Sequence, residues 1–239
     1  MYLTVDRKTL HAGLSAVVRA IHDRSSLPVL LNVLLEAKSD GDCHMLLRAT
    51  DLELSIERRV PISCRQPGSV TLPARTLVDI VAALPDGEVT VSTEENHAGA
   101  ITRGKSRFRI QGLPAFEYPP AVGIGSGWRF RIGQDTLHRL ISRVISAVSR
   151  DDTRPVLTGA EFQADGNALC LAATDTHRLN VAQGAIVTDS PFDPAAPIVP
   201  GRALRHLLHL LDDRSGDAVI CEFDANQARF AMGHTVLTK

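Results

Sequence analysis

The sequence has few aromatic residues and lacks the short motifs of several common enzyme classes. One Trp, two Tyr and seven Phe make up only 4% of the 239 residues, too few to favour stacking against the bases of a single strand. No G-x-G-x-x-G fingerprint, H-E-x-x-H zinc motif or G-x-S-x-G nucleophile elbow is present. We also predict no phosphate-binding P-loop. The sequence therefore gives no motif that points to a catalytic site.

Excess charge, paired cysteines and long apolar runs are missing as well. The net charge is −1, so there is no global basic signal for nucleic acid, although one face can still be basic. The four cysteines form no C-x-x-C pair and are typical of small buried residues in a reducing cytoplasm. No run approaches the roughly 18 apolar residues of a membrane span. These absences predict a cytoplasmic protein with no metal, no cofactor and no membrane contact.

The chain repeats itself at an offset of 127 residues. Three motifs recur at that offset: Thr9-Leu-His with Thr136-Leu-His, Pro28-Val-Leu with Pro155-Val-Leu, and Pro73-x-Arg with Pro200-x-Arg. A register held over so many residues indicates two copies of one domain. The second copy stops at Lys239, which the offset pairs with Gly112, whereas the first continues to Tyr118. We therefore expect the second domain to lack its last residues.

Each copy shows apolar patterns of both helix and strand. Apolar residues at helical spacing alternate with groups of short strands. We expect helices at 8–21, 75–84, 135–148 and 202–211, and strands at 2–6, 29–37, 44–50, 52–60, 70–72, 88–93, 98–103, 106–112, 128–132, 156–164, 168–174, 178–184, 217–223, 227–232 and 235–239. Each domain is thus a pair of strand-helix-three-strand units. This pattern predicts an α+β fold with two helices packed on antiparallel sheets.

The predicted domains are separated by a short Pro- and Gly-rich segment. Domain one is expected at 1–120, a linker at 121–127 and domain two at 128–239.

Two Asp residues are the first candidates for catalysis. Asp175 lies two residues before His177, and Asp51 lies two residues before Glu53. Both Asp residues follow Ala-Thr, at an offset of 124 that a shorter preceding hairpin would explain. Use of one position in both copies favours a structural turn in which Asp bonds nearby backbone N–H groups. An enzyme that uses the Asp175–His177 region remains an alternative hypothesis.

Two histidines on one predicted helix are a candidate metal pair. His206 and His209 are three residues apart, but isolated helix histidines are more typical of exposed or interfacial positions. We predict no metal site.

Basic residues recur at equivalent loops and helix starts. Arg24 lies in the first helix-to-strand loop, and Arg150 and Arg154 lie in the same loop of the second copy, whereas Arg75 and Arg202 each open a second helix. Basic side chains that lie on one face of a protein can neutralise DNA phosphates without recognising the base sequence. These five arginines predict non-specific contact with the backbone of duplex DNA.

Several motifs resemble those of one bacterial family. They are Leu27-Pro-Val-Leu, Ala49-Thr-Asp-Leu-Glu, Leu72-Pro-Ala-Arg, Lys105-Ser-Arg-Phe, Leu113-Pro with Phe116-Glu-Tyr-Pro, Arg154-Pro-Val-Leu-Thr-Gly, Ala173-Thr-Asp-Thr-His-Arg-Leu and Ile198-Val-Pro. Together they resemble the DNA polymerase III β subunit, the sliding clamp. The resemblance covers essentially the whole chain, in order and spacing.

The resemblance implies a non-catalytic processivity factor of DNA replication. In the family, three like domains per chain and two chains form a ring around duplex DNA, with no cofactor. The implied partners are duplex DNA, the DNA polymerase III α subunit, the clamp loader and repair polymerases. The protein partners bind the clamp through a short linear motif. Topology then supplies processivity, and backbone contact lets the ring slide.

The resemblance also implies roles for individual residues. The DNA-contacting positions are Arg24, Arg75, Arg150, Arg154 and Arg202. The peptide-binding pocket is implied at Thr174, His177, Arg178, Leu179 and Leu157, with Arg154 beside it. Thr176 replaces the small residue often found between Asp and His in the family, which reshapes the pocket rim.

The chain departs from the family at its C-terminal side. We expect the third clamp domain, which in the family supplies part of the pocket and half of each subunit interface, to be absent. The matching edge here is the strand 107–111, with Phe108 and Ile110 as apolar contacts. We expect no closed two-subunit ring at this length. The alternative function is a shortened clamp-like module that binds clamp-motif peptides without encircling DNA.

Overall fold

The computed structural model describes residues 1–22, 25, 27–39, 43–121, 123–125, 127–188 and 196–239. The chain forms two compact units, Met1–Ala121 and Val122–Lys239. No helix among the described residues is both long enough and apolar enough to span a bilayer.

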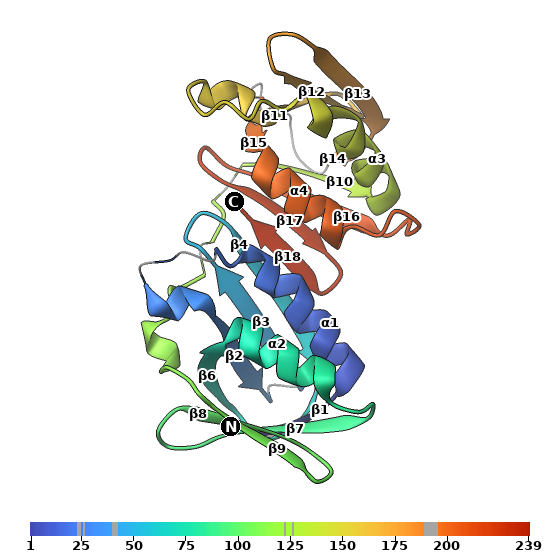
Figure 1. Ribbon diagram of the computed structural model, residues 1–239. Coiled ribbons are helices and arrows are strands. Elements are labelled where there is room, and N and C mark those ends of the chain that lie inside the picture. Colours follow the sequence, from blue (N-terminus) through green and yellow to red (C-terminus); the bar gives the residue numbers. More distant parts are fainter. Residues whose placement is uncertain (23–24, 26, 40–42, 122, 126, 189–195) are drawn as a thin grey trace. The chain divides into compact units, whose positions relative to one another are not determined.

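The first unit consists of short strands and two α-helices (Figure 1). Its strands are β1 (Tyr2–Asp6), β2 (Asn32–Lys38), β3 (His44–Thr50), β4 (Ser55–Pro61), β5 (Ser63–Gln66), β6 (Gly68–Pro73), β7 (Glu88–Thr93), β8 (Ala98–Arg103) and β9 (Ser106–Gln111). Its helices are α1 (Arg7–Val17) and α2 (Ala74–Ala83), with 3₁₀ turns η1 (Val18–Ala20), η2 (Pro28–Leu31) and η3 (Ala115–Glu117).

Two antiparallel sheets connect the two halves of this unit, which are β1 to β5 with α1 and β6 to β9 with α2. One sheet has the order β5-β1-β7-β8-β9, and the other has the order β4-β3-β2-β6. The first strand of each half therefore pairs within the other half's sheet, because β1 pairs with β7 and β6 pairs with β2. This exchange makes the two halves one folding unit with a shared core.

Helix α1 packs closely on the sheet. It begins after Asp6, whose carboxylate accepts a hydrogen bond from the Thr9 N–H at 3.0 Å, a common helix N-cap. The helix packs against β3, β4 and α2 (Figure 1). A Cβ at Gly13 would lie 2.8 Å from side-chain atoms of Leu47 and Val60. Glycine at this position therefore allows the close approach of helix and sheet.

The second unit repeats this plan. Its strands are β10 (Trp128–Gly133), β11 (Gly159–Asp165), β12 (Ala168–Thr174), β13 (Leu179–Ala185), β14 (Val187–Thr188), β15 (Ile198–Pro200), β16 (Ala218–Phe223), β17 (Ala228–Met232) and β18 (Thr235–Thr238). Its helices are α3 (Gln134–Val144) and α4 (Gly201–Leu210), with 3₁₀ turns η4 (Ile145–Ala147) and η5 (Pro155–Leu157). Its strand orders are β14-β10-β16-β17-β18 and β13-β12-β11-β15.

The cores of the two units differ in chemistry. Phe162 and Phe230 of the second unit are buried beside Phe223, with ring centroids 5.6 and 5.7 Å from the Phe223 ring. Trp128 stacks on Phe223 at 5.3 Å. Aliphatic side chains such as Leu47 instead dominate the core of the first unit.

The predicted α+β class is confirmed, and so is the duplication. Helices α1 and α3 keep the predicted offset of 127. β3 and β12 are offset by 124 because the hairpin before β12 is three residues shorter, as predicted. The predicted helices 8–21 and 135–148 are each an α-helix that continues as a 3₁₀ turn.

Several predicted boundaries are wrong. The expected strands 29–37 and 156–164 begin as 3₁₀ turns, because Pro28 and Pro155 fix φ near helical values and lack an N–H for a sheet. The strand expected at 52–60 is β4, which begins at Ser55 because residues 51–54 form the turn after β3. Strands β5, β14 and β15 were not predicted, since each has four residues or fewer and shows little alternation.

Candidate functional site

A cavity of about 1060 Å³ opens in the second unit. Four segments line it: η4 with the loop behind it, the segment around η5, the β12–β13 turn and one face of α4. The lining residues are Ile145, Ser146, Val148, Ser149, Arg150, Asp151, Arg154, Leu157, Asp175, Thr176, His177, Arg178, Arg205, Leu208 and His209. The volume lies just above the usual range for small-molecule pockets, so the cavity can hold several residues of an extended peptide.

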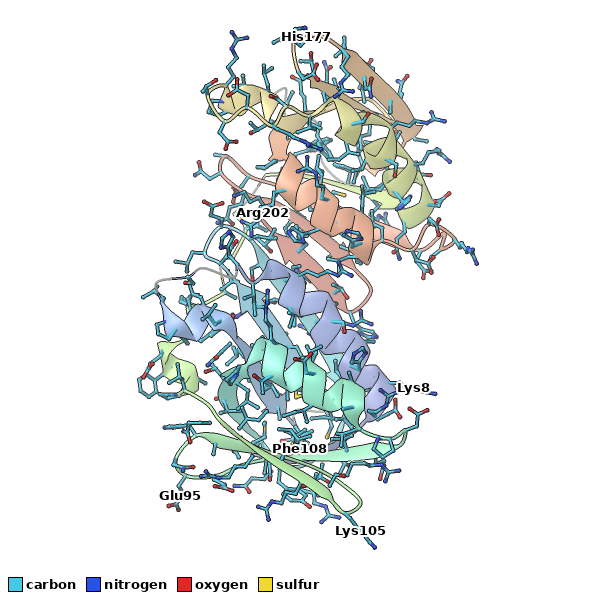
Figure 2. All side chains as sticks on the ribbon, viewed as in Figure 1. Lys8, Glu95, Lys105, Phe108, His177 and Arg202 are labelled. Atoms are coloured by element: carbon cyan, nitrogen blue, oxygen red, sulfur yellow. The ribbon has the colours of Figure 1, made fainter. Side chains whose placement is uncertain are left out.

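The β12–β13 turn is fixed by its own hydrogen bonds. The carboxylate of Asp175 accepts from the N–H groups of His177 and Arg178, both at 3.1 Å. The Arg178 guanidinium donates to the same carboxylate at 2.8 Å. Thr176 has φ 78°, a left-handed conformation that is uncommon for β-branched residues. The turn therefore places His177 at its tip (Figure 2).

These bonds give Asp175 a structural role. Partial desolvation raises the pKa of Asp175, but the N–H donors of His177 and Arg178 and the Arg178 charge outweigh it, so the pKa lies below its ordinary value. Asp51 makes the same turn in the first unit and accepts from the N–H groups of Glu53 and Leu54. The predicted structural turn is confirmed at both positions.

The opposite wall is held by a chain of local bonds. The Ser149 N–H donates to the Leu157 carbonyl at 2.9 Å. The Ser149 hydroxyl accepts from the Asp151 N–H at 3.0 Å, and Asp151 accepts from the Thr153 N–H at 3.0 Å. The bonds from Thr153 lower the pKa of Asp151. They fix the loop that carries Arg150 and Arg154 at the cavity wall.

The cavity has an excess of basic groups. Its charged lining residues are the acidic Asp151 and Asp175 and the basic Arg150, Arg154, Arg178 and Arg205. His177 and His209 also line it. Both acidic side chains are already engaged in local hydrogen bonds. The field of such a lining favours a ligand with an acidic group.

The predicted pocket residues lie in and around this cavity. Leu157, His177 and Arg178 line it. Thr174 lies at the base of the turn, where its hydroxyl donates to the Arg178 carbonyl at 2.8 Å. Leu179, the first residue of β13, is largely exposed beside the turn. The structure thus brings all five predicted residues to one end of the unit.

The predicted DNA-contacting arginines occupy two kinds of position. Arg150 and Arg154 line the cavity, whereas Arg75 and Arg202 lie in the first turns of α2 and α4 (Figure 2 labels Arg202). Arg24 lies outside the described residues. The placement of Arg75 and Arg202 follows directly from the repeat.

The predicted interface residues lie on the edge strand β9. Phe108 is 38% exposed, whereas Ile110 is 8% exposed. Figure 2 labels Phe108 on this strand. Arg109 on the same strand pairs with Glu94 at 3.0 Å. Phe108 is thus an exposed apolar side chain on this edge, whereas Ile110 packs inside the unit.

Sequence reasoning missed the part of the lining contributed by α4. Arg205, Leu208 and His209 are spaced i, i+3, i+4 and therefore share one helix face. That spacing is a signal that could have found them. His209 lines the cavity but His206 does not, and no group of three metal-ligating side chains is found among the described residues.

One motif prediction needs correction. The run Gly99-Ala-Ile-Thr-Arg-Gly-Lys-Ser fits the residue pattern of a P-loop. The structure places this run in strands β8 and β9, with Gly104 in the tight turn at φ 58°. A P-loop needs a glycine-rich loop that opens a helix, which this antiparallel hairpin does not provide. The pattern is present, but the phosphate-binding structure is not.

Solved structures share this architecture over the whole chain. The DNA polymerase sliding clamp from Bacillus subtilis matches with a TM-score of 0.92 and 29% identity, over 100% of this chain and 64% of that chain. The sliding clamp from Pseudomonas aeruginosa bound to griselimycin matches with a TM-score of 0.91 and 32% identity, again over 100% and 64%. Fold and site together define a protein of the DNA-clamp class.

Sequence comparisons give the family. Residues 1–122 match the N-terminal domain of the DNA polymerase III beta subunit, and residues 131–239 match its central domain. The beta sliding clamp of Synechocystis sp. is 34% identical over 100% of this chain and 65% of its own length. That of Staphylococcus epidermidis is 33% identical over 98% and 63%. The chain belongs to the DNA polymerase III beta subunit family and spans about two-thirds of its relatives' length.

Proposed function

We propose that this chain acts in a DNA sliding clamp, as a processivity factor that tethers the replicative polymerase to duplex DNA. The observation that carries the proposal is the basic cavity of the second unit, where Leu157, His177 and Arg178 meet. Clamp family membership supports the same function. The role is binding rather than catalysis, and its place is the cytoplasm.

The cavity is the proposed docking site for a short linear motif. Partners are the polymerase III α subunit, the clamp loader and repair polymerases. An extended peptide would place an apolar anchor against Leu157 and Leu208, and its acidic group near Arg154 or Arg178. Because the lining loops are fixed by local hydrogen bonds, binding costs little ordering of the protein.

Arginines at equivalent positions are the proposed contacts to DNA. Arg75 and Arg202 open equivalent helices, and Arg24 and Arg150 occupy equivalent parts of the chain. Contact with phosphates alone carries no sequence preference, so the clamp can slide. Encirclement rather than tight affinity then keeps the polymerase on its template.

Domain boundaries and assembly complete the proposal. Domain one spans 1–120, the linker 121–127 and domain two 128–239. In the ring, the β9 edge with Phe108 would meet another subunit, because an open edge strand pairs readily with a partner strand. A closed homodimeric ring requires the third domain of the family.

Peptide binding tests the docking site. A fluorescein-labelled peptide with an Asp-Leu-Phe core is titrated against the 239-residue chain and followed by fluorescence anisotropy. We expect His177→Ala with Leu157→Ala to weaken binding about tenfold or more, as loss of central contacts does. The matched control is His234→Ala, which removes an exposed histidine from the same unit and should leave affinity unchanged. Equal effects of the two variants would remove the cavity from the proposal.

DNA topology separates the clamp from the alternative of a peptide-binding module. The 239-residue chain is fused to the third domain of a relative and loaded onto nicked circular DNA. The DNA is then linearised. Retention on circles and loss from linear DNA supports the clamp. Peptide binding without topological retention supports the module instead.

A further inference from the structure

The first unit has a surface equivalent to the cavity of the second unit. The β3–β4 turn matches the β12–β13 turn, and Leu52 and Thr176 share a left-handed backbone with φ 77° and 78°. The side chains differ, because Leu52 replaces Thr176 and Glu53 replaces His177. At the other wall, the 127-residue offset places Leu27 where the second unit has Arg154. Apolar and acidic residues thus stand where the second unit is polar and basic.

A buried tyrosine gathers three segments at this surface. The Tyr118 hydroxyl accepts from the Thr50 N–H at 3.1 Å and lies 3.2 Å from the Arg48 carbonyl and 3.5 Å from the Asn32 carbonyl. Burial raises the pKa of Tyr118 to about 12, so the hydroxyl keeps its proton. Its bonds hold η2, the β3–β4 turn and η3 together, since Asn32 follows η2, Thr50 precedes the turn and Tyr118 follows η3.

Large apolar side chains from these three segments face solvent. We call them the apolar patch: Leu27, Leu31, Leu52 and Phe116, which are 48, 38, 60 and 85% exposed. Exposed apolar side chains that gather in one place mark interaction sites, whereas scattered ones do not. Phe108 and Phe116, the Phe residues of the first unit, are exposed, whereas the described Phe residues of the second unit are all buried.

The backbone at Leu52 is held in a costly conformation. A left-handed φ is uncommon for a residue with a large side chain. The Thr50 hydroxyl accepts from the Leu52 N–H at 3.0 Å and donates to the Leu54 carbonyl at 2.9 Å. The turn therefore holds an exposed leucine in place, and does not bury it.

Within the three segments that carry the patch the charges have one sign, whereas the nearby Arg48, which faces the Tyr118 ring, is buried and pairs with Glu57 at 3.6 Å. The described residues of 27–32, 50–54 and 113–118 include Asp51, Glu53 and Glu117 but no Lys or Arg. We propose that the apolar patch docks a basic, apolar segment of a partner protein, a ligand opposite in charge to that of the second-unit cavity. Such a surface would let one chain hold two different segments at once. This inference goes beyond the clamp function proposed above and does not depend on the second-unit cavity.

Two matched peptides test the proposal. Fluorescein-labelled peptides with the cores Lys-Leu-Phe-Lys and Glu-Leu-Phe-Glu are titrated against the 239-residue chain by fluorescence anisotropy. We expect the basic peptide to bind more tightly, with an affinity that falls as salt rises. Phe116→Ala with Leu52→Ala should weaken its binding about tenfold. Glu53→Lys or Glu117→Lys should weaken it about twofold to fivefold, as rim charges do.

Control variants distinguish the apolar patch from the rest of the chain. Glu95→Lys makes the same charge change in the exposed β7–β8 turn (Figure 2) and should leave binding unchanged, as should His234→Ala in the second unit. Circular dichroism checks that the variants fold. The proposal is overturned by equal binding of both peptides, by no binding of the basic one, or by binding that survives the Phe116 and Leu52 changes. Self-association that disappears on Phe116→Ala would assign the patch to a second copy and overturn it too.

Discussion

The two units share one backbone plan but place their aromatic and charged side chains differently. In the second unit Phe130, Phe162, Phe223 and Phe230 are buried, and the equivalent turn opens on a basic cavity. In the first unit Phe116 of η3 is exposed beside Glu117, and the β3–β4 turn presents Leu52 and Glu53. The comparison teaches that duplication preserved the frame while the chemistry of the equivalent surfaces diverged.

What the units share is the set of bonds that fix the frame. Asp51 and Asp175 accept the same pair of backbone N–H bonds. The hydroxyls of Thr50 and Thr174 donate to the carbonyl four residues later, at 2.9 and 2.8 Å. Side chains that take no part in these bonds were free to change, and those side chains determine what each surface can bind.

The largest expected effect concerns the two cores. Phe162→Ala removes a ring that packs against both Phe223 and Phe230 and should lower the free energy of unfolding by about 3–5 kcal/mol. Leu47→Ala in the aliphatic core should cost about 2–5 kcal/mol. Urea unfolding is followed by circular dichroism and by fluorescence of Trp128, which reports on the aromatic core. A loss below about 1 kcal/mol for Phe162→Ala would show that the ring is not tightly packed.

A smaller effect tests the tyrosine that organises the first unit. Tyr118→Phe leaves the buried Thr50 N–H without its acceptor and should lower the free energy of unfolding by about 1–3 kcal/mol. Tyr2→Phe, at a half-exposed tyrosine of the same unit, is the control. Equal stabilities of the two variants would contradict the role given to the hydroxyl.

The arginines at equivalent helix starts should contribute equally to DNA binding. Arg75→Ala and Arg202→Ala should each flatten the dependence of log K on log salt by about 0.9 for every phosphate that the arginine neutralises. The measurement is anisotropy of a labelled duplex across salt concentrations, with chain joined to a relative's third domain. Arg65→Ala, on the strand β5, is the control. Unequal slopes would break the equivalence of the two units at this position.

The smallest effect is the pH dependence of the second-unit turn. Because the folded-state pKa of Asp175 is lowered, the carboxylate stabilises the fold above its unfolded pKa. That contribution disappears as pH falls through the folded pKa. Asp175→Asn should therefore lower Tm at about pH 7, and the difference from the unchanged chain should shrink as the pH falls through the folded pKa of Asp175. A Tm difference that persists undiminished at acidic pH would assign the loss to packing rather than to charge.

The sequence predicted the frame better than the site, for physical reasons. Helix periodicity and the shared offset located α1 to α4, since both depend on local spacing. The repeat also predicts that the hairpin before Asp175 is three residues shorter than its counterpart in the first unit. Short strands such as β14 escaped because tertiary pairing rather than propensity forms them. The α4 face with Arg205 escaped because its neighbours across the cavity are distant in sequence.

Peptide titration of ¹⁵N-labelled chain, followed by amide chemical shifts, tests the central claim most directly. With the Asp-Leu-Phe peptide, the account predicts shifts at the amides of Ser149, Thr176 and His177. It predicts none at the equivalent amide of Glu53 in the first unit. Equal shifts in both units, or none at the cavity, would contradict the claim that the second unit carries the motif-binding site.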